Sequence, residues 1–535
     1  MIAALKTQGE GEARVLDPPP VVLDEPAEKA SRFPRWLPLV LVLALATVLR
    51  FYRLGAENFW IDEIFSLAQA ENPLSAIAGF WSLDERMTSR PLGLTLLYWA
   101  LQLGESEFIA RLPYAILSVL EVGALYLLSR DLVGRKVALR AALFLAVLPL
   151  HVWYAQEARW YAQWSLLATL SLWALLRLWK TWRPGWAIAY GVATLLDLYT
   201  FVMSIFVLIT QMLTTLLLPA RGPRWTFWKR AAIAMLGAVL LSLPVFLVAA
   251  GFRVEDSAEA GVGTRRATSI VVLPYTFFVY VAGYTVGPTV AQLHALPSPV
   301  WIVREYPEVV LYFVYFLPLA ALGLWALRNR PASAAILLPW ALGLPLLVFA
   351  SAVLGQQTYN VRYSLAALPG FALLLAVGVE SLGRWRSAGT LGAVGLFGLS
   401  VFNYHGNPRF DKEDVRSAIA HIQAGPEADE PVAMIGQGIV AAIHYGENLT
   451  VEQLRGCGRE LSRVPRKDRQ LPEIPIEEIR SEPVFWLLAS RDWHGRTESC
   501  LEALDASHEV VQERSFTGVD LFLLRRHRVD AEQTQ

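Results

Sequence analysis

The sequence predicts a polytopic α-helical membrane protein that carries a small soluble α/β domain at its C-terminal end. Three observations lead to this prediction. Hydrophobic residues make up 55% of the 535 residues and charged residues only 18%, which is typical of membrane proteins. Apolar runs long enough to cross a bilayer recur between residues 36 and 404. From about residue 405 onward the composition becomes that of an ordinary soluble protein.

Eleven apolar runs are expected to span the membrane, because a helix needs about 20 apolar residues to cross the bilayer core. They lie at 36–52, 109–129, 138–155, 162–179, 185–200, 201–219, 231–250, 309–327, 332–354, 363–382 and 389–404. Two shorter or interrupted segments, 91–104 and 269–290, are expected to be helices at the membrane surface. Residues 35–404 are therefore predicted to form the membrane domain.

The loops between these runs indicate an orientation. The polar tail at residues 1–34 is predicted to be disordered, and the first apolar run starts too late for a cleaved signal sequence, so it is expected to be a retained anchor. Lys and Arg are dense in "RDLVGRKVALR", "RLWKTWR" and "RGPRWTFWKR", which places these loops and the N-terminus in the cytoplasm. The alternate loops, and everything after Tyr404, are then expected to lie outside it.

Residues 405–535 are predicted to form an α/β domain on that outer side. The stretches "EPVAMIG", "EPVFWLLAS" and "GVDLFLLRR" read as buried strands, and "DKEDVRSAIAHIQA" and "CLEALDAS" read as helices. The two cysteines, Cys457 and Cys500, could form one disulfide in an oxidising compartment. No glycine-rich phosphate fingerprint or metal-ligand cysteine spacing is found here, so the role of the domain stays open.

Charged side chains collect in the loops expected outside the cytoplasm. Lys plus Arg equals Asp plus Glu, at 47 each, which gives no reason to expect a nucleic-acid partner. The stretch "NFWIDEIFSL" places Asp62 and Glu63 just past the first span, where a solvated helix end is the simplest explanation. The same external loop also contains Asp84 and Arg90, and other external turns add Glu157, Arg159 and Arg362.

This mixture suits a reaction in which an alcohol or amine loses a proton while an anionic group departs. A carboxylate can accept the proton and orient the nucleophile, and Asp62 is the candidate. Arginines remain charged and donate paired hydrogen bonds to phosphate, and Arg90, Arg159 and Arg362 are the candidates. Each arginine taken singly is equally explained as an interfacial side chain that extends its charge toward water.

A polar run lies at the point where one predicted span ends and the next begins. In "LPLHVWYAQEARWYAQWSLL" the residues Gln156, Glu157 and Arg159 stand between Tyr154 and Tyr161. Polar residues at this depth are expected to line a cavity. The alternative is a short hydrated turn flanked by an interfacial aromatic belt.

Four segments in this order resemble the polyprenyl-phosphate-sugar-dependent membrane glycosyltransferases of the GT-C type, of the glycosyltransferase family 39 kind. They are "FWIDEIFSL", "LDERMTSRPLGLTLLYWALQLGESEFIARLPYAILSVL", "LAVLPLHVWYAQEARWYAQ" and "YNVRYSLAALPGFALLLAVG". The family includes protein O-mannosyltransferases and the aminoarabinose transferase that acts on lipid A. The likeness covers most of residues 35–405.

The resemblance implies a GT-C-like fold of eleven to thirteen spans, an active site on the outer face, and an acid of the first external loop as catalytic base. Carried onto this chain, the base is Asp62, with Glu63 as the second acid of the pair. The further substrate-binding residues that it implies are Asp84, Gln156, Glu157, Arg159, Arg362 and Tyr363. The chain departs from the family at Arg90-Pro91-Leu92-Gly93, where relatives usually have two prolines, and this leaves donor specificity open.

The expected function is transfer of a hexosyl or pentosyl group from a polyprenyl-phosphate donor to a lipid, glycan or protein acceptor, with inversion at the sugar. The membrane is expected to be a bacterial plasma membrane, and a divalent metal at the acidic cluster is left open. Two alternatives remain: a transporter or flippase, against which the absence of internal repeats counts, and a non-catalytic component of polysaccharide assembly.

Overall fold

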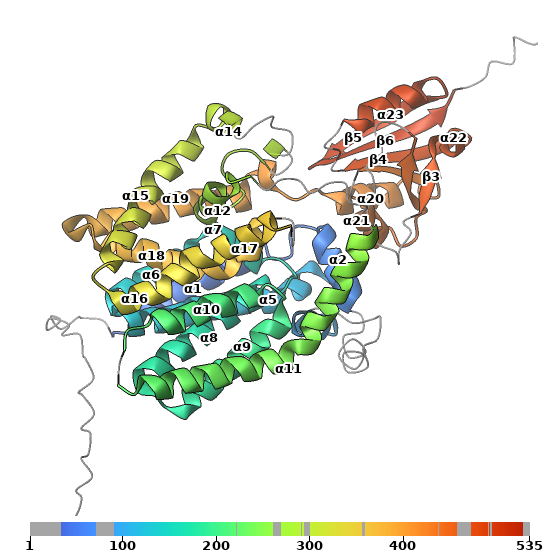
Figure 1. The fold of residues 1–535 in the computed structure, drawn as a ribbon. Coiled ribbons are helices and arrows are strands. Elements are labelled where there is room, and N and C mark those ends of the chain that lie inside the picture. Colours follow the sequence, from blue (N-terminus) through green and yellow to red (C-terminus); the bar gives the residue numbers. More distant parts are fainter. Residues whose placement is uncertain are drawn as a thin grey trace, which may run out of the picture.

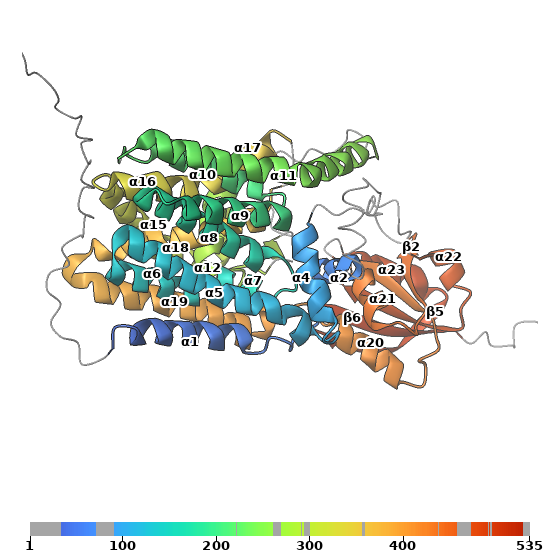
Figure 2. The ribbon, with the colours of Figure 1, turned by 90° about the horizontal axis from the view of Figure 1, so that it is seen from below.

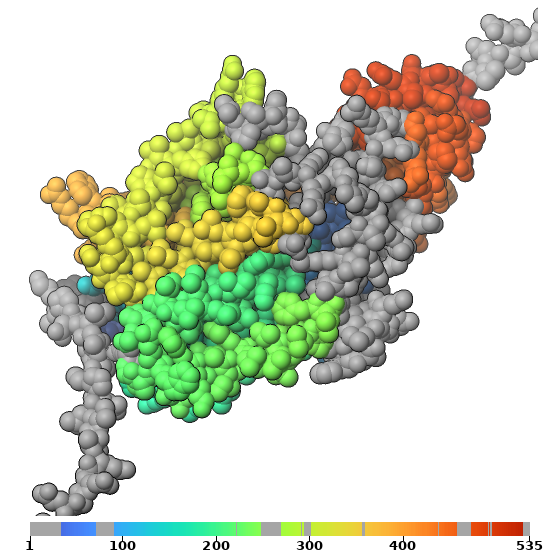
Figure 3. Space-filling view, in the orientation of Figure 1, coloured from blue at the N-terminus to red at the C-terminus, as the bar shows by residue number. Residues whose placement is uncertain are grey.

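The computed structural model describes residues 34–70, 90–220, 222–259, 269–289, 292–293, 300–355, 359–436, 438–456, 472–490, 492 and 495–527. A helical bundle forms the larger part, and the C-terminal α/β domain projects from one end of it (Figures 1 and 3). The N-terminal tail predicted to be disordered lies outside the described residues except for Pro34.

The first half of the bundle contains nine described helices. They are α1 (Leu37–Phe51), α2 (Ile61–Ala70), α4 (Pro91–Leu101), α5 (Glu107–Val133), α6 (Arg135–Val147), α7 (Pro149–Ala155), α8 (Tyr161–Thr181), α9 (Pro184–Thr200) and α10 (Ser204–Leu217). Helices suit a membrane because each satisfies its own backbone hydrogen bonds where water is absent. Side chains at the lipid-facing side of α1, such as Leu41 and Val48, are strongly exposed.

The second half of the bundle follows the same pattern. Its described helices are α11 (Arg224–Glu259), α12 (Val272–Ala282), α14 (Val300–Glu305), α15 (Glu308–Leu327), α16 (Pro331–Leu337), α17 (Leu344–Val353), α18 (Leu368–Glu380) and α19 (Arg386–Gly406). A π-helical segment, Leu338–Gly343, joins α16 to α17, and a 3-10 segment, Val361–Ala367, leads into α18. The 3-10 segment carries Arg362 and Tyr363.

Five helical stretches of the described chain are long and apolar enough to cross a membrane: Glu107–Val133, Arg224–Leu247, Glu308–Leu327, Pro331–Val353 and Val361–Glu380. The predicted span at 138–155 is divided instead into α6 and α7, which meet at 58°. Pro149 explains the break, because proline cannot donate the hydrogen bond that would continue α6. The pair could be a sixth span, and the expected count of eleven stays a prediction.

Each of the two segments expected at the membrane surface contains one helix that is shorter than the segment. Segment 91–104 contains α4, which ends at Leu101, and the described part of segment 269–290 contains α12, Val272–Ala282. Helix α4 lies beside α2 at the end of the bundle that faces the C-terminal domain (Figure 2). This end also carries the site described below.

The C-terminal domain is a six-stranded mixed sheet with strand order β3-β2-β1-β4-β6-β5. Strands β1 (Val432–Gly436), β4 (Val484–Ser490) and β6 (Val519–Arg526) coincide with the predicted strands, and α20 (Val415–Ala424) and α23 (Arg496–Asp505) with the predicted helices. The strands β2 (Val451–Arg455), β3 (Glu473–Pro475) and β5 (His508–Phe516) and the helices α21 (Ile439–Tyr445) and α22 (Ile476–Ile479) complete the described domain.

The two faces of this sheet belong to different cores. One face, with Met434, Trp486 and Leu521, joins the apolar cluster that continues into the bundle. The other face, with Phe485 and Leu487, packs in a separate cluster. Side chains alternate across a strand, so the same strands serve both cores and attach the domain to the bundle.

Candidate active site

Helix α2 places the two adjacent acids at the end of the bundle that faces the C-terminal domain. Asp62 and Glu63 stand in its first turn, where carboxylates interact favourably with the positive end of the helix dipole. The Glu63 carboxylate also accepts a hydrogen bond from the backbone N–H of Trp60, at 3.2 Å. Successive helix residues point about 100° apart, and the two acids accordingly face different surroundings.

Glu63 is fully buried and surrounded by cations. Arg111 of α5 donates two hydrogen bonds to its carboxylate, at 2.8 and 2.9 Å, and the backbone N–H of Ala158 donates a third at 2.8 Å. The ammonium group of Lys412 lies 3.3 Å from the same carboxylate. Burial alone would raise the pKa of Glu63, but Arg111 and Lys412 lower it to about 2. Glu63 is therefore a charged anchor between elements and does not line the neighbouring cavity.

Asp62 lines a cavity of about 190 Å³ beside α2. Its carboxylate is 3.0 Å from a guanidinium nitrogen of Arg159 and also pairs with Arg362. Arg159 donates a further hydrogen bond to the backbone carbonyl of Asp62, at 3.0 Å. The described residues that line the cavity are Asp62, Phe65, Ser66, Gln69, Arg90, Arg159, Trp160, Tyr161, Phe201, Val202, Met203, Arg362 and Tyr363.

One indole ring positions two of the arginines. The guanidinium carbons of Arg90 and Arg159 each lie 4.5 Å from the centre of the Trp160 ring. Arginine stacks favourably on aromatic faces and keeps its N–H groups available for an anion. The three arginines come from three distant parts of the chain: the start of α4, the turn before α8, and the 3-10 segment before α18. Among the described lining residues, positive charges outnumber the single carboxylate.

Only some residues of the predicted substrate-binding run line the cavity, and the others contact neighbouring parts of the bundle. Arg159 and Tyr161 line the cavity. Gln156 instead donates hydrogen bonds of 2.9 Å to the backbone carbonyls of Arg50 and Tyr52, at the end of α1. The hydroxyl of Tyr154 contacts that of Tyr284, at 3.3 Å.

Glu157 occupies the turn between α7 and α8. Its Oε1 accepts a hydrogen bond from the indole of Trp153, at 2.9 Å, whereas its buried Oε2 has no hydrogen-bond partner among the described residues. Burial raises the pKa of Glu157 to about 7. Glu157 and Arg159 are linked through the backbone, where the Arg159 N–H donates to the Glu157 carbonyl at 2.7 Å.

Several further predictions concern a metal ligand set or residues that the structure does not describe. Asp84 and Cys457 lie outside the described residues, so the role of Asp84 and a bridge from Cys457 to Cys500 stay predictions; Cys500 is buried in the domain core. In the described ranges, no group of three or more His, Cys, Asp or Glu side chains could hold a metal ion. Sequence reasoning did not select Arg111, although it lies inside the second of the four segments that carry the resemblance, or Lys412, which lies outside all four. Only the fold brings the two cations to Glu63.

Comparison with known proteins agrees with the motifs. Residues 90–250 match the family model described as dolichyl-phosphate-mannose-protein mannosyltransferase. The fold is similar to that of ArnT from Cupriavidus metallidurans bound to undecaprenyl phosphate, with a TM-score of 0.52 and 15% identity, covering 92% of this chain and 98% of that one. For the apo state of ArnT the TM-score is 0.53 at 15% identity, with 91% and 97% covered.

No curated protein matches the chain in sequence. The family match and the fold together confirm the resemblance that the motifs carry and the membrane character of the protein. The chain is therefore an integral membrane protein with a fold similar to that of ArnT, and over residues 90–250 it is similar to the dolichyl-phosphate-mannose-protein mannosyltransferases.

Proposed function

We propose that this protein is a membrane glycosyltransferase that moves a sugar from a polyprenyl-phosphate donor to an acceptor on the extracytoplasmic face. The family match and the fold support glycosyl transfer in general. The observation that carries the proposal is the cavity beside α2, in which the Asp62 carboxylate meets three arginines. A carboxylate and a set of fixed cations are the two groups that such a displacement requires.

The arginines are assigned to the donor phosphate. Arg90, Arg159 and Arg362 line one cavity, and guanidinium groups bind phosphate oxygens through paired hydrogen bonds. In the transition state, negative charge grows on the phosphate oxygen that leaves the sugar. Cations that are already in position stabilise that charge without reorganisation. Because phosphate is a good leaving group, the mechanism needs no acid to protonate it.

Asp62 is assigned to the acceptor. The acceptor oxygen or nitrogen attacks the anomeric carbon, its proton passes to the Asp62 carboxylate, and the bond from the anomeric carbon to the phosphate oxygen breaks with both electrons leaving on the phosphate. The attacking and leaving atoms lie on opposite faces of the sugar, so a single displacement inverts the anomeric configuration. Glu63 is assigned to holding α2, since its carboxylate is buried and fully engaged.

The ion pairs of Asp62 bear on whether donor binding or acceptor deprotonation comes first. Without donor, Arg159 and Arg362 pair with Asp62, and a carboxylate held between two cations is a weak proton acceptor. A phosphate that enters the cavity competes for the same guanidinium groups. Donor binding is therefore expected to precede acceptor deprotonation, because it releases the base.

The test is the variant Asp62→Asn, assayed for transfer from a panel of labelled undecaprenyl-phosphate sugars, both hexosyl and pentosyl, in membranes that contain the native acceptors. We expect transfer to fall by about a hundredfold or more, as for loss of a general base. Asp429→Asn, at an exposed position of the C-terminal domain, is the matched control and should keep wild-type transfer. Wild-type activity in Asp62→Asn would remove Asp62 as the base.

A further inference from the structure

The C-terminal domain and the linker before it contact the chain just ahead of the proposed base. We call residues 56–63, which lead from α1 into α2, the α2 entry segment. It is contacted by Lys412 of the linker, by Arg416 of α20 and by Tyr445 of α21. The packing of α2 against α21 adds to these polar contacts. Residues 349 to 386 positions apart in sequence thus meet beside Asp62.

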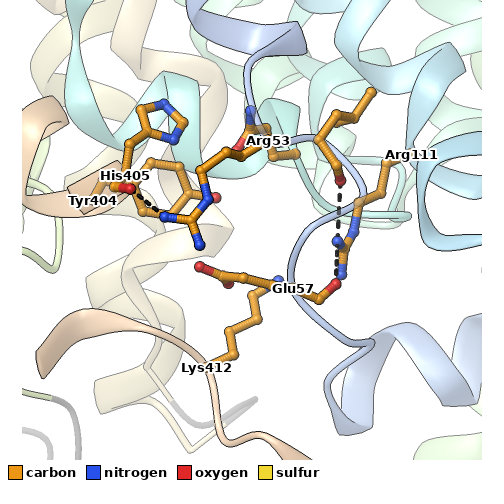
Figure 4. Close-up of a pocket in the computed structure, with 8 residues that line it drawn as sticks. Arg53, Glu57, Arg111, Tyr404, His405 and Lys412 are labelled. Atoms are coloured by element: carbon orange, nitrogen blue, oxygen red, sulfur yellow. Dashed lines mark hydrogen bonds between the residues drawn. The ribbon is translucent and has the colours of Figure 1, made fainter. Parts of the chain in front are cut away.

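Lys412 reaches into the buried interior of this interface. Its side chain is 7% exposed, and its ammonium group lies 3.3 Å from the carboxylate of Glu63, which is 0% exposed. Figure 4 shows Lys412 extending toward the α2 entry segment at Glu57, between Tyr404 on one side and Arg111 on the other. Arg111 donates to the backbone carbonyls of Leu54 and Glu57, at 3.2 and 2.8 Å. Burying a lysine is costly unless its charge is paired, and this pairing fixes the linker to α2.

Arg416 and Tyr445 hold the start of the same segment. Arg416 donates to the carbonyl of Ala56 at 2.8 Å and pairs with Glu107 of α5 at 2.7 Å. The hydroxyl of Tyr445 accepts from the backbone N–H of Phe59 at 2.7 Å and donates to Glu107 at 3.0 Å. Two residues of the C-terminal domain therefore fix the backbone of the entry segment and the start of α5 together.

These contacts act on the base without touching it. Asp62 is the neighbour of Glu63 in the first turn of α2, so a shift of that turn moves the Asp62 carboxylate by a similar amount. The arginines assigned to the phosphate stand on other elements, at the start of α4, before α8 and before α18, and Arg159 and Arg362 are linked to the α2 turn through Asp62 itself. A change at the interface should therefore disturb the base more than the donor site.

We propose that the C-terminal domain is a positioning element for catalysis, in which Lys412, with Arg416 and Tyr445, sets the placement of Asp62 through the α2 entry segment. This inference rests on the proposed function of Asp62. It assigns the domain a task in the transfer step and makes Lys412 a positioning residue. Loss of the contact lowers kcat and leaves the KM for the donor nearly unchanged.

The test compares three variants of the full chain in lipid nanodiscs: Lys412→Met, Lys412→Arg and Arg455→Met. The first removes the charge at similar length, the second keeps the charge, and the third breaks an exposed pair with Glu473 elsewhere in the same domain. Two quantities are measured: kcat and KM with the undecaprenyl-phosphate sugar that the wild-type chain uses, and amide hydrogen exchange over residues 56–66.

In Lys412→Met we expect kcat to fall by about tenfold or more, since small misplacements of catalytic groups have effects of this size, with KM within about twofold. Exchange over residues 56–66 should accelerate. Lys412→Arg and Arg455→Met should resemble wild type in both measurements. Tyr445→Phe, which removes only a hydroxyl, should change kcat and exchange in the same direction and provides the test if Lys412→Met does not fold.

Wild-type kcat and wild-type exchange in both Lys412→Met and Tyr445→Phe would overturn the positioning role. A parallel rise in KM and fall in kcat in Arg455→Met as well would also overturn it, because the effect would then be general to the domain. Failure of the proposed function has a different signature, full transfer by Asp62→Asn, and the exchange measurement stands independently of that result.

Discussion

At the scale of single residues, two adjacent acids do different work because the helix turns between them. Asp62 has a side chain that is 23% exposed and lines the cavity, whereas Glu63 is 0% exposed. A buried carboxylate that accepts hydrogen bonds from an arginine, a backbone N–H and a lysine is held in its charged form. Its loss leaves the guanidinium of Arg111 buried without its counter-charge, which is the costly outcome for a buried pair.

Glu63→Gln is therefore expected to destabilise the protein by about 3 kcal/mol, seen as a lower midpoint of thermal unfolding in detergent. Glu427→Gln is the control, because Glu427 pairs at 3.8 Å with a half-exposed Arg525, and such pairs contribute about 1 kcal/mol or less. Equal midpoints for Glu63→Gln and wild type would contradict the anchor role.

The same anchor predicts a pH dependence. Folding lowers the pKa of Glu63 from its ordinary value of 4.5 to about 2, so the charged form is favoured in the folded state. Its contribution to stability is complete above about pH 4.5 and is lost as the pH falls toward 2. The difference in midpoint between wild type and Glu63→Gln should shrink over that window.

At the scale of elements, the sequence predicted most helices and the three central strands, because long apolar runs and alternating strands leave clear patterns. It did not predict the bend between α6 and α7 or the strands β2, β3 and β5, which are short or half-exposed. In the site, motifs selected Asp62, Arg90, Arg159 and Arg362, and the structure brings these four into one cavity. Lys412 and Arg111 could not be selected, since their partners are distant in sequence and visible only after folding.

Trp160 links the start of α4 to the turn before α8, because Arg90 and Arg159 both stack on its ring. Trp160→Leu keeps an apolar side chain but removes the aromatic face, and the KM for the undecaprenyl-phosphate sugar should rise by about tenfold for two lost cation–π contacts. Trp160→Phe should keep most of the affinity. Trp385→Leu removes an exposed ring that stacks with Arg384 and should leave KM unchanged. An unchanged KM in Trp160→Leu would show that the stacking does not support the donor site.

At the scale of the whole molecule, the bundle supplies the arginines that we propose to bind phosphate, and the C-terminal domain contacts the segment that leads into the helix of the proposed base. The cavity lies beside α2, and α2 stands at the end of the bundle where these two parts meet (Figures 1 and 2). The proposed positioning role gives the soluble domain a task that follows from its contacts with the bundle. Its described contacts with residues 56–63 are polar and directional, and they orient the entry segment as well as attach it.

The central claim is that Asp62 and the donor phosphate share Arg159 and Arg362. The most direct test is the dissociation constant of undecaprenyl phosphate, measured for wild type, Asp62→Asn and Arg362→Gln in the same nanodiscs. Removing the competing carboxylate should tighten binding by about fivefold in Asp62→Asn, whereas Arg362→Gln should weaken it by about tenfold. Unchanged or weaker binding in Asp62→Asn, or unchanged binding in Arg362→Gln, would contradict the account.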